Sequence, residues 1–157
     1  MNRFIMADAA KCIGCRTCEV ACVVSHQENQ DCAAVSSGEF ASRIRVIKDS
    51  TFTTAVSCRQ CEDASCARVC PTQAIRRERG HLYVEQERCI GCKSCVLACP
   101  FGAMNVVARA SQIRALKCDL CWHRAAGPAC VEACPTRALR CVDAEQEQRQ
   151  RLYAQPL

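Results

Sequence analysis

The sequence predicts an α+β fold in which two similar modules of short antiparallel strands and short helices surround cysteine-rich loops. Two observations support this prediction: a cysteine motif of one kind occurs four times, and short strand-like segments alternate with the four motifs. No low-complexity linker interrupts the 157 residues. We therefore expect residues 1–157 to form a single compact unit that contains both modules.

The third motif indicates which chemistry these loops serve. It follows the C-x2-C-x2-C-x3-C-P pattern of bacterial iron–sulfur proteins, with Cys89, Cys92, Cys95, Cys99 and Pro100. Gly91 lets the backbone pass close to a cluster, and the proline ends the short helix. The fourth cysteine lies one helical turn beyond the third and ligates the neighbouring cluster. A zinc site requires ligands in two pairs and has no use for the third cysteine or the proline.

The other three motifs repeat this spacing with changes. Their cysteines are Cys12, Cys15, Cys18 and Cys22 in the first, Cys58, Cys61, Cys66 and Cys70 in the second, and Cys118, Cys121, Cys130 and Cys134 in the fourth. The first lacks the proline, while the second and fourth have longer gaps between the second and third cysteines. The four motifs supply enough ligands for four [4Fe–4S] clusters.

Two cysteines fall outside the motifs. Cys32 lies in a polar segment, and we expect it to be a spare thiol. Cys141 alternates with Leu139 on the last strand-like segment, and we expect it to be a small buried hydrophobe.

Composition narrows the class of protein. Eighteen cysteines in a short secreted chain would indicate a disulfide scaffold. The first residues, however, contain no apolar signal segment, and no stretch is long enough to span a bilayer. We therefore expect a cytoplasmic protein without direct membrane insertion, whose reduced thiols are metal ligands.

The charge of the chain depends on its cofactors. The formal net charge of +5 counts the cysteines as neutral. Four clusters at about −2 each would bring the loaded protein to about −3. Aromatic residues make up only 4% of the chain, so nucleic acid is not an expected partner. Because the ordinary core is small, we expect the protein without clusters to be largely disordered.

In chain order, the predicted strands cover residues 3–7, 43–48, 53–57, 74–77, 81–84, 103–107, 113–117 and 138–142. The helix of the first motif continues to Ser25 because no proline ends it. Residues 27–54 are an insertion that contains the second strand and the start of the third, and Gly80 lies in a hairpin turn. Residues 143–157 form a C-terminal helix and tail, with Asp143 as the helix N-cap.

Spacing alone does not decide which motifs share clusters, because the second, third and fourth motifs begin at nearly equal intervals. The chain resembles the four-cluster iron–sulfur subunits of the molybdopterin oxidoreductase family, and within it the short HydN-type electron-transport proteins. The segments Met1–Ile5, Lys11–Cys22, Ser25–Cys32 and Lys117–Cys121 carry this resemblance. Members of the family serve formate dehydrogenases, dimethyl sulfoxide reductases and nitrate reductases.

The resemblance implies that motif one crosses with motif four, and motif two with motif three. The implied ligands are Cys12, Cys15, Cys18 and Cys134 for cluster 1; Cys22, Cys118, Cys121 and Cys130 for cluster 2; Cys58, Cys61, Cys66 and Cys99 for cluster 3; and Cys70, Cys89, Cys92 and Cys95 for cluster 4. Module A would then comprise residues 1–30 and 110–142, and module B residues 55–108.

The sequence contains no nucleophile with a base and no phosphate-binding loop. We therefore expect an electron-transfer protein rather than an enzyme. It would relay single electrons to or from a molybdopterin-containing catalytic subunit such as formate dehydrogenase, with a second redox protein as a further partner. A free soluble polyferredoxin that shuttles between several redox enzymes is the alternative, and a colourless structural zinc protein is a more distant one.

Three histidines and one tryptophan are the remaining candidates for a functional role. His26, His81 and His123 have no partner at metal-ligand spacing, so the sequence assigns them no chemistry. Trp122 lies inside the long gap of the fourth motif, and we expect it to pack over that cluster, with a partner contact as the alternative.

Overall fold

The computed structural model describes residues 2–109 and 112–153. The elements in order are β1 (Arg3–Ala7), α1 (Thr17–Ser25), η1 (Cys32–Ala34), η2 (Ser37–Glu39), β2 (Ile44–Lys48), β3 (Thr53–Ser57), α2 (Ser65–Arg68), β4 (Ile75–Glu78), β5 (His81–Val84), η3 (Gln86–Arg88), α3 (Ser94–Ala98), β6 (Asn105–Arg109), β7 (Gln112–Leu116), α4 (Ala129–Glu132), β8 (Leu139–Asp143) and α5 (Ala144–Tyr153). This mixture of antiparallel strand pairs and short helices confirms the predicted α+β class.

Within the described ranges the strands form four two-stranded antiparallel sheets, β1–β8, β2–β3, β4–β5 and β6–β7. Three of these pairs are hairpins between consecutive strands. The fourth joins the two ends of the chain, with Arg3 opposite Asp143 and Ala7 opposite Leu139. This pairing brings the loop of the first cysteine motif beside that of the fourth.

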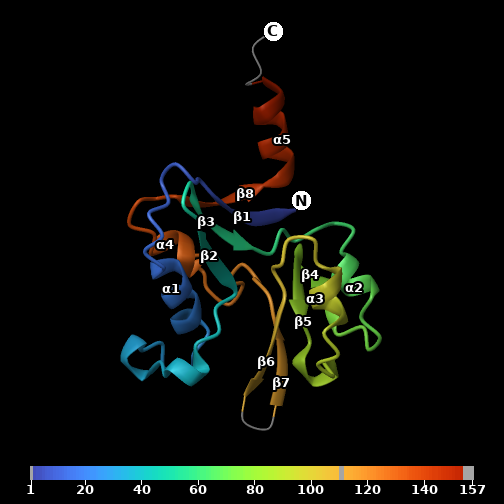
Figure 1. Ribbon diagram of the computed structural model, residues 1–157. Helices are drawn as coiled ribbons and strands as arrows, with labels where there is room; N and C mark the ends of the chain where they lie inside the picture. The colour runs from blue at the N-terminus through green and yellow to red at the C-terminus, as the bar shows by residue number, and fades with distance from the viewer. Residues whose placement is uncertain (1, 110–111, 154–157) are drawn as a thin grey trace.

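Two groups of helices lie apart from each other in Figure 1. Helices α1 and α4 pack together on one side, below the β1–β8 pair, while α2 and α3 pack together beside the β4–β5 hairpin. Each group has its own buried core, in which cysteines take the place that larger apolar side chains occupy in most proteins. The fold is therefore arranged around two cysteine-lined centres.

The first core includes part of the predicted insertion. Ile44 and Val46 on β2 are buried beside Cys18 and Cys22 of α1. The backbone N–H of Val46 also donates a hydrogen bond to the Glu19 carboxylate at 2.6 Å. The strand pair β2–β3 consequently forms a wall of this core. The second core contains Ile75, Leu82 and Met104 together with Cys66 and Cys95.

Most predicted elements occur where they were expected. The strands at 3–7, 53–57 and 81–84 are confirmed without change, and α1 ends at Ser25 as predicted. The Asp143 carboxylate accepts a hydrogen bond from the N–H of Glu145 at 3.0 Å, which confirms the N-cap of α5. The strand expected at 103–107 instead spans Asn105–Arg109, because the chain first completes a turn after Pro100. Residues 110–111 at the predicted edge of module A and residues 154–157 of the predicted tail lie outside the described residues.

Two expectations about single side chains were wrong. Cys141 is half-buried rather than buried, because it lines an open groove where the Arg3 guanidinium lies 3.5 Å from its Sγ. Trp122 is 61% exposed and stacks on the His81 ring, with 5.9 Å between the ring centroids. It therefore lies against the β4–β5 hairpin instead of covering the cysteines of its own motif.

No helix in the described part of the chain is both long enough and apolar enough to cross a membrane.

Candidate cluster-binding sites

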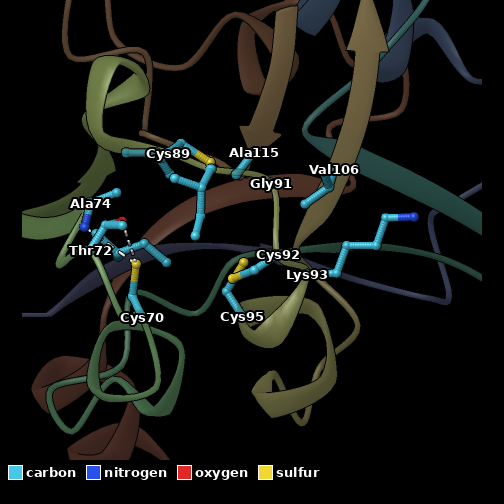
Figure 2. A pocket seen from close by; sticks show the side chains of 13 residues that line it. Cys70, Thr72, Ala74, Cys89, Gly91, Cys92, Lys93, Cys95, Val106 and Ala115 are labelled. Atoms are coloured by element: carbon cyan, nitrogen blue, oxygen red, sulfur yellow. Dashed lines mark hydrogen bonds between the residues drawn. The ribbon is translucent and has the colours of Figure 1, made fainter.

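Three cavities are each lined by four cysteines, of which three come from one motif and one from another. The three sets are Cys12, Cys15, Cys18 and Cys134; Cys22, Cys118, Cys121 and Cys130; and Cys70, Cys89, Cys92 and Cys95. Figure 2 shows the third set arranged around its pocket, with Gly91 and Ala115 on the same wall.

A fourth set consists of Cys58, Cys61, Cys66 and Cys99. Burial raises the pKa of Cys66 to about 11, and the neighbouring Cys58 and Cys99 thiols add to this effect. The pKa of Cys61 is raised by burial and by the same two thiols. Cys58 and Cys99 thus lie close enough to Cys61 and to Cys66 to affect both thiols electrostatically.

The exchange of one cysteine between sets follows from helix geometry. Cys18 and Cys22 lie one turn apart on α1 and line different cavities. Cys130 on α4 and Cys134 just beyond it do the same in the opposite sense. Since α1 packs against α4 and α2 against α3, the structure brings together motifs one and four, and likewise motifs two and three. Motif spacing alone had left this pairing open.

The tight loops between the first two cysteines of each motif require a left-handed residue. Gly14 and Gly91 both have φ of +70°. A Cβ on Gly91 would lie 2.3 Å from the Cγ2 of Ile113, so a side chain cannot be accommodated without movement. The equivalent residues of the second and fourth motifs are Gln60 and Leu120, with φ of 53° and 61°. Their backbone N–H groups donate to the Sγ of Cys58 and Cys118 at 3.4 Å.

Hydroxyl groups lie beside the cysteines of the first and third motifs. The Thr17 hydroxyl donates to Cys15 Sγ at 3.3 Å and holds the pKa of that thiol below its ordinary value. The Ser94 hydroxyl, 3.5 Å from Cys92 Sγ, has the same effect on Cys92. The thiolate is the form that binds metal, so these hydroxyls favour the ligand state.

Hydrogen bonds also lower the pKa of Cys70 and Cys134, two cysteines that each line a cavity formed mainly by another motif. Burial acts to raise the pKa of each thiol, but hydrogen bonds to the sulfur outweigh it and the pKa is lowered. At Cys70 these bonds come from the Thr72 hydroxyl, drawn as a dashed line in Figure 2, and from the N–H of Ala74 at 3.3 Å.

Two buried cysteines have raised rather than lowered pKa values. Burial raises the pKa of Cys118 to about 12, and it also raises the pKa of Cys130. Burial therefore favours the neutral thiol, and a thiolate at these positions requires a compensating positive charge such as a bound metal. Four thiols on tight loops with N–H groups directed at sulfur are the donor set of a [4Fe–4S] cluster.

A polar network supports the cavity of Cys22, Cys118, Cys121 and Cys130. His26 lies with Nδ1 2.7 Å from the carbonyl oxygen of Cys22 and Nε2 3.1 Å from the Asp119 carboxylate. Asp119 also pairs with the Arg43 guanidinium, and the N–H of Arg43 donates to Cys22 Sγ at 3.3 Å. Burial opposes protonation of His26, but the Asp119 carboxylate raises its pKa to about 10.

Sequence reasoning missed this network. It assigned no chemistry to His26 because the histidine has no partner at ligand spacing, and Asp119 is 93 positions away. The atoms of His26, Asp119 and Cys121 lie within 4.8 Å of one another, a distance that would suit a metal ion. Since Cys121 also lines the cysteine cavity and Asp119 is paired with Arg43, we interpret the network as structural support for that cavity.

Comparison with known proteins agrees with this chemistry. Residues 49–144 match the 4Fe-4S dicluster domain family, and residues 9–24 match a 4Fe-4S binding domain. The chain is 73% identical over its full length to YsaA of Escherichia coli K12, a candidate electron transport protein, and covers all of it. It is 62% identical to the electron transport protein HydN of the same strain, over 91% of this chain and 89% of HydN. It is also 50% identical to AegA, a candidate oxidoreductase of that strain, over 90% of this chain but only 22% of AegA. The chain therefore belongs to the family of 4Fe-4S dicluster proteins that includes YsaA and HydN.

Proposed function

We propose that this protein carries four [4Fe–4S] clusters and relays single electrons to or from a molybdopterin-containing catalytic subunit, formate dehydrogenase being the leading candidate. The observation that carries the proposal is the gathering of the motif cysteines into four sets of four. The proposed ligand sets are those implied by the family resemblance: cluster 1 at Cys12, cluster 2 at Cys118, cluster 3 at Cys58 and cluster 4 at Cys89, each with its three companions.

The role of the protein is to hold the clusters close together and to set their potentials. Clusters 1 and 2 share α1 and α4, and clusters 3 and 4 share α2 and α3, so one helical turn, about 5.4 Å, separates the ligands of neighbours. Bound clusters would supply one-electron transfer by tunnelling, the rate of which falls steeply with distance. Burial and N–H groups directed at sulfur adjust each potential.

The ends of this series lie at the surface. Cys15 of cluster 1 and Cys92 of cluster 4 are exposed, and so are the preceding Ile13 and Ile90. An exposed ligand shortens the distance to a partner's redox centre, so we propose that electrons enter and leave at these two loops. By resemblance to the larger complexes, cluster 1 faces the catalytic subunit and cluster 4 a second redox protein.

The partner class is supported by the relatives. HydN is named an electron transport protein, and AegA contains a similar segment within a longer chain named as an oxidoreductase. We accordingly propose that this protein delivers electrons to, or accepts them from, an oxidoreductase. We place it in the cytoplasm, because a reducing compartment keeps thiols available as cluster ligands.

The cofactor proposal is tested by anaerobic purification. The protein should be brown and contain about sixteen iron and sixteen acid-labile sulfide per chain. About eight of each would mean that two of the four sets are not cluster sites. A colourless protein without sulfide would support a zinc protein instead.

The partner proposal requires a separate experiment. The tagged protein is captured anaerobically from cells grown under fermentative conditions, and co-purifying chains are identified by mass spectrometry. A molybdopterin-containing subunit in stable amount supports the proposal. Recovery of the loaded protein alone, with electron transfer to several enzymes in solution, supports a free polyferredoxin.

A further inference from the structure

One lysine lies in the interior between two of the cysteine sets. Lys117 follows β7 and is only 2% exposed. Its ammonium donates to the carbonyl oxygens of Leu82 at 2.5 Å and Cys118 at 2.8 Å. Among the residues that the structure describes, no carboxylate lies within ion-pair distance of it. A buried ammonium with only neutral hydrogen-bond partners is costly unless a negative charge lies nearby.

Gln60 holds together the two backbone segments to which this lysine donates. Its side chain is fully buried, with Nε2 donating to the carbonyl of Cys118 at 2.6 Å and Oε1 accepting from the N–H of Leu82 at 2.7 Å. Gln60 and Lys117 thus bind the same two residues. The backbone N–H of Gln60 also donates to Cys58 Sγ at 3.4 Å. The pair therefore connects a ligand of proposed cluster 2 with a ligand of proposed cluster 3.

The charge of Lys117 acts on both sets. Burial is the main cause that raises the pKa of Cys61, Cys66 and Cys118, and the Lys117 ammonium acts against that rise at all three. Cys118 belongs to one set, while Cys61 and Cys66 belong to the other. A positive charge in this place favours negative charge at both centres.

We propose that Lys117 is the shared counter-cation of the two central clusters, and that Gln60 positions the Leu82 and Cys118 segments whose carbonyl groups hold its ammonium. The inference rests on the proposed function, because it requires clusters at both sites. Each loaded cluster carries about −2 when oxidised and about −3 when reduced, which supplies the negative charge that a buried ammonium needs.

The consequence concerns the step between modules. A fixed cation stabilises the reduced form of a cluster more than the oxidised form, because the reduced form carries one more negative charge. Acting on both central clusters, it raises both potentials together. The difference in potential between the two clusters would therefore change little, while both would be easier to reduce.

The test compares lysine variants in the anaerobic holoprotein. Lys117→Met removes the charge, Lys117→Gln removes the charge but keeps a hydrogen-bond donor, and Lys117→Arg keeps the charge. Lys11→Met is the matched control, because Lys11 also precedes the first cysteine of a motif but has a side chain that is 61% exposed. Cys99→Ser and Cys22→Ser identify the signals of the central clusters. Iron content and the potentials of all four clusters are measured by redox titration followed by electron paramagnetic resonance.

Both neutral variants should lower the potentials of clusters 2 and 3. At a fixed applied potential the ratio of reduced to oxidised cluster should fall about tenfold, equivalent to about 59 mV for one electron. Clusters 1 and 4 should change much less, and Lys117→Arg and Lys11→Met should resemble the unmodified protein. If both neutral variants lose iron from the central sites while Lys117→Arg retains it, the requirement for charge is also supported.

Three results would overturn the inference: unchanged potentials in iron-replete neutral variants, a shift confined to one cluster, or equal iron loss in Lys117→Arg. The proposed function is judged separately by the iron count of the unmodified protein. If the unmodified protein holds about sixteen iron but the neutral variants leave the central potentials unchanged, the role of Lys117 is rejected and the proposed function is not.

Discussion

The proposed clusters fall into two kinds that differ in their surroundings. The outer sites, centred on Cys15 and Cys92, each have an exposed cysteine, a left-handed glycine in the loop and a hydroxyl beside the sulfur. The inner sites, centred on Cys118 and Cys58, have no exposed cysteine. The same motif therefore occurs in two environments. The residue directly before its second cysteine is glycine in the outer sites and a residue with a larger side chain in the inner sites.

The difference in exposure between the two kinds of site has a steric cause. In the outer sites Gly14 and Gly91 let the loop lie against Thr53 and Ile113, which leaves the sulfur near the surface. In the inner sites the equivalent positions are Gln60, whose side chain is fully buried, and Leu120, whose side chain is half-buried against the first core. The inner sites are thus shielded from solvent, as suits transfer within the protein, and the outer sites are open to partners.

Removal of the clusters should have the largest effect, because it abolishes both kinds of site. The thiols of Cys118 and Cys66 are buried, and so is Lys117, which has no carboxylate at ion-pair distance within residues 2–109 and 112–153. We therefore expect the inner sites to require metal. After treatment with acid or a chelator, the circular dichroism should approach that of a disordered chain. Cooperative unfolding in the cluster-free protein would show that the chain holds its fold without metal.

Loss of the polar network should weaken one inner site selectively. Asp119→Asn leaves His26 and Arg43 without their buried carboxylate. We expect the free energy of unfolding to fall by about 3–5 kcal/mol and iron to be released faster from cluster 2. The measurement is the rate of iron transfer to a chelator, resolved by the signal of each cluster.

A matched control separates this effect from a general one. Asp63→Asn breaks an ion pair with Arg68 in which both side chains are well exposed, and it should cost less than about 1 kcal/mol. Equal iron release in the two variants would mean that the network does not support cluster 2.

A graded glycine series should sharpen the description of the outer loops. Gly91→Ala introduces a Cβ 2.3 Å from Ile113 Cγ2 at a φ of +70°, while Gly14→Ala meets Thr53 Cγ2 at 2.9 Å with the same φ. We expect a cost of about 1–3 kcal/mol for each, with Gly91→Ala the larger, and faster loss of the corresponding outer cluster. Gly38→Ala, which meets nothing within 4 Å, is the control and should leave cluster retention unchanged. The reverse order would contradict the steric explanation.

Much of this arrangement could be predicted from the sequence. The motif spacing identified the cysteines, and alternating segments located most strands, because both are local patterns. The pairing of β1 with β8 is not local, and motif spacing left the crossing of motifs open. The contacts of Gln60 and Lys117 with Leu82, and of His26 with Asp119, join residues far apart in sequence and leave no periodic pattern.

Trp122 is another residue whose contacts could not be predicted from the sequence. Its place inside the fourth motif suggested contact with its own cluster, but the long gap lets the ring reach His81 on β5. A gap of that length gives no information on the direction in which the loop folds.

The most direct test of the proposed arrangement is the spectrum of the crossing-ligand variants, each with one cysteine replaced. Cys22→Ser should alter the inner cluster held by Cys118, Cys121 and Cys130, and leave the outer cluster of Cys12, Cys15 and Cys18 intact, although Cys22 is their neighbour in sequence. Cys134→Ser should do the converse. Low-temperature electron paramagnetic resonance of the anaerobically reduced variants distinguishes the outcomes, with one cluster signal changed in each. If Cys22→Ser and Cys70→Ser instead perturb the same pair of clusters, motifs one and two are partners, and the division into inner and outer sites is wrong.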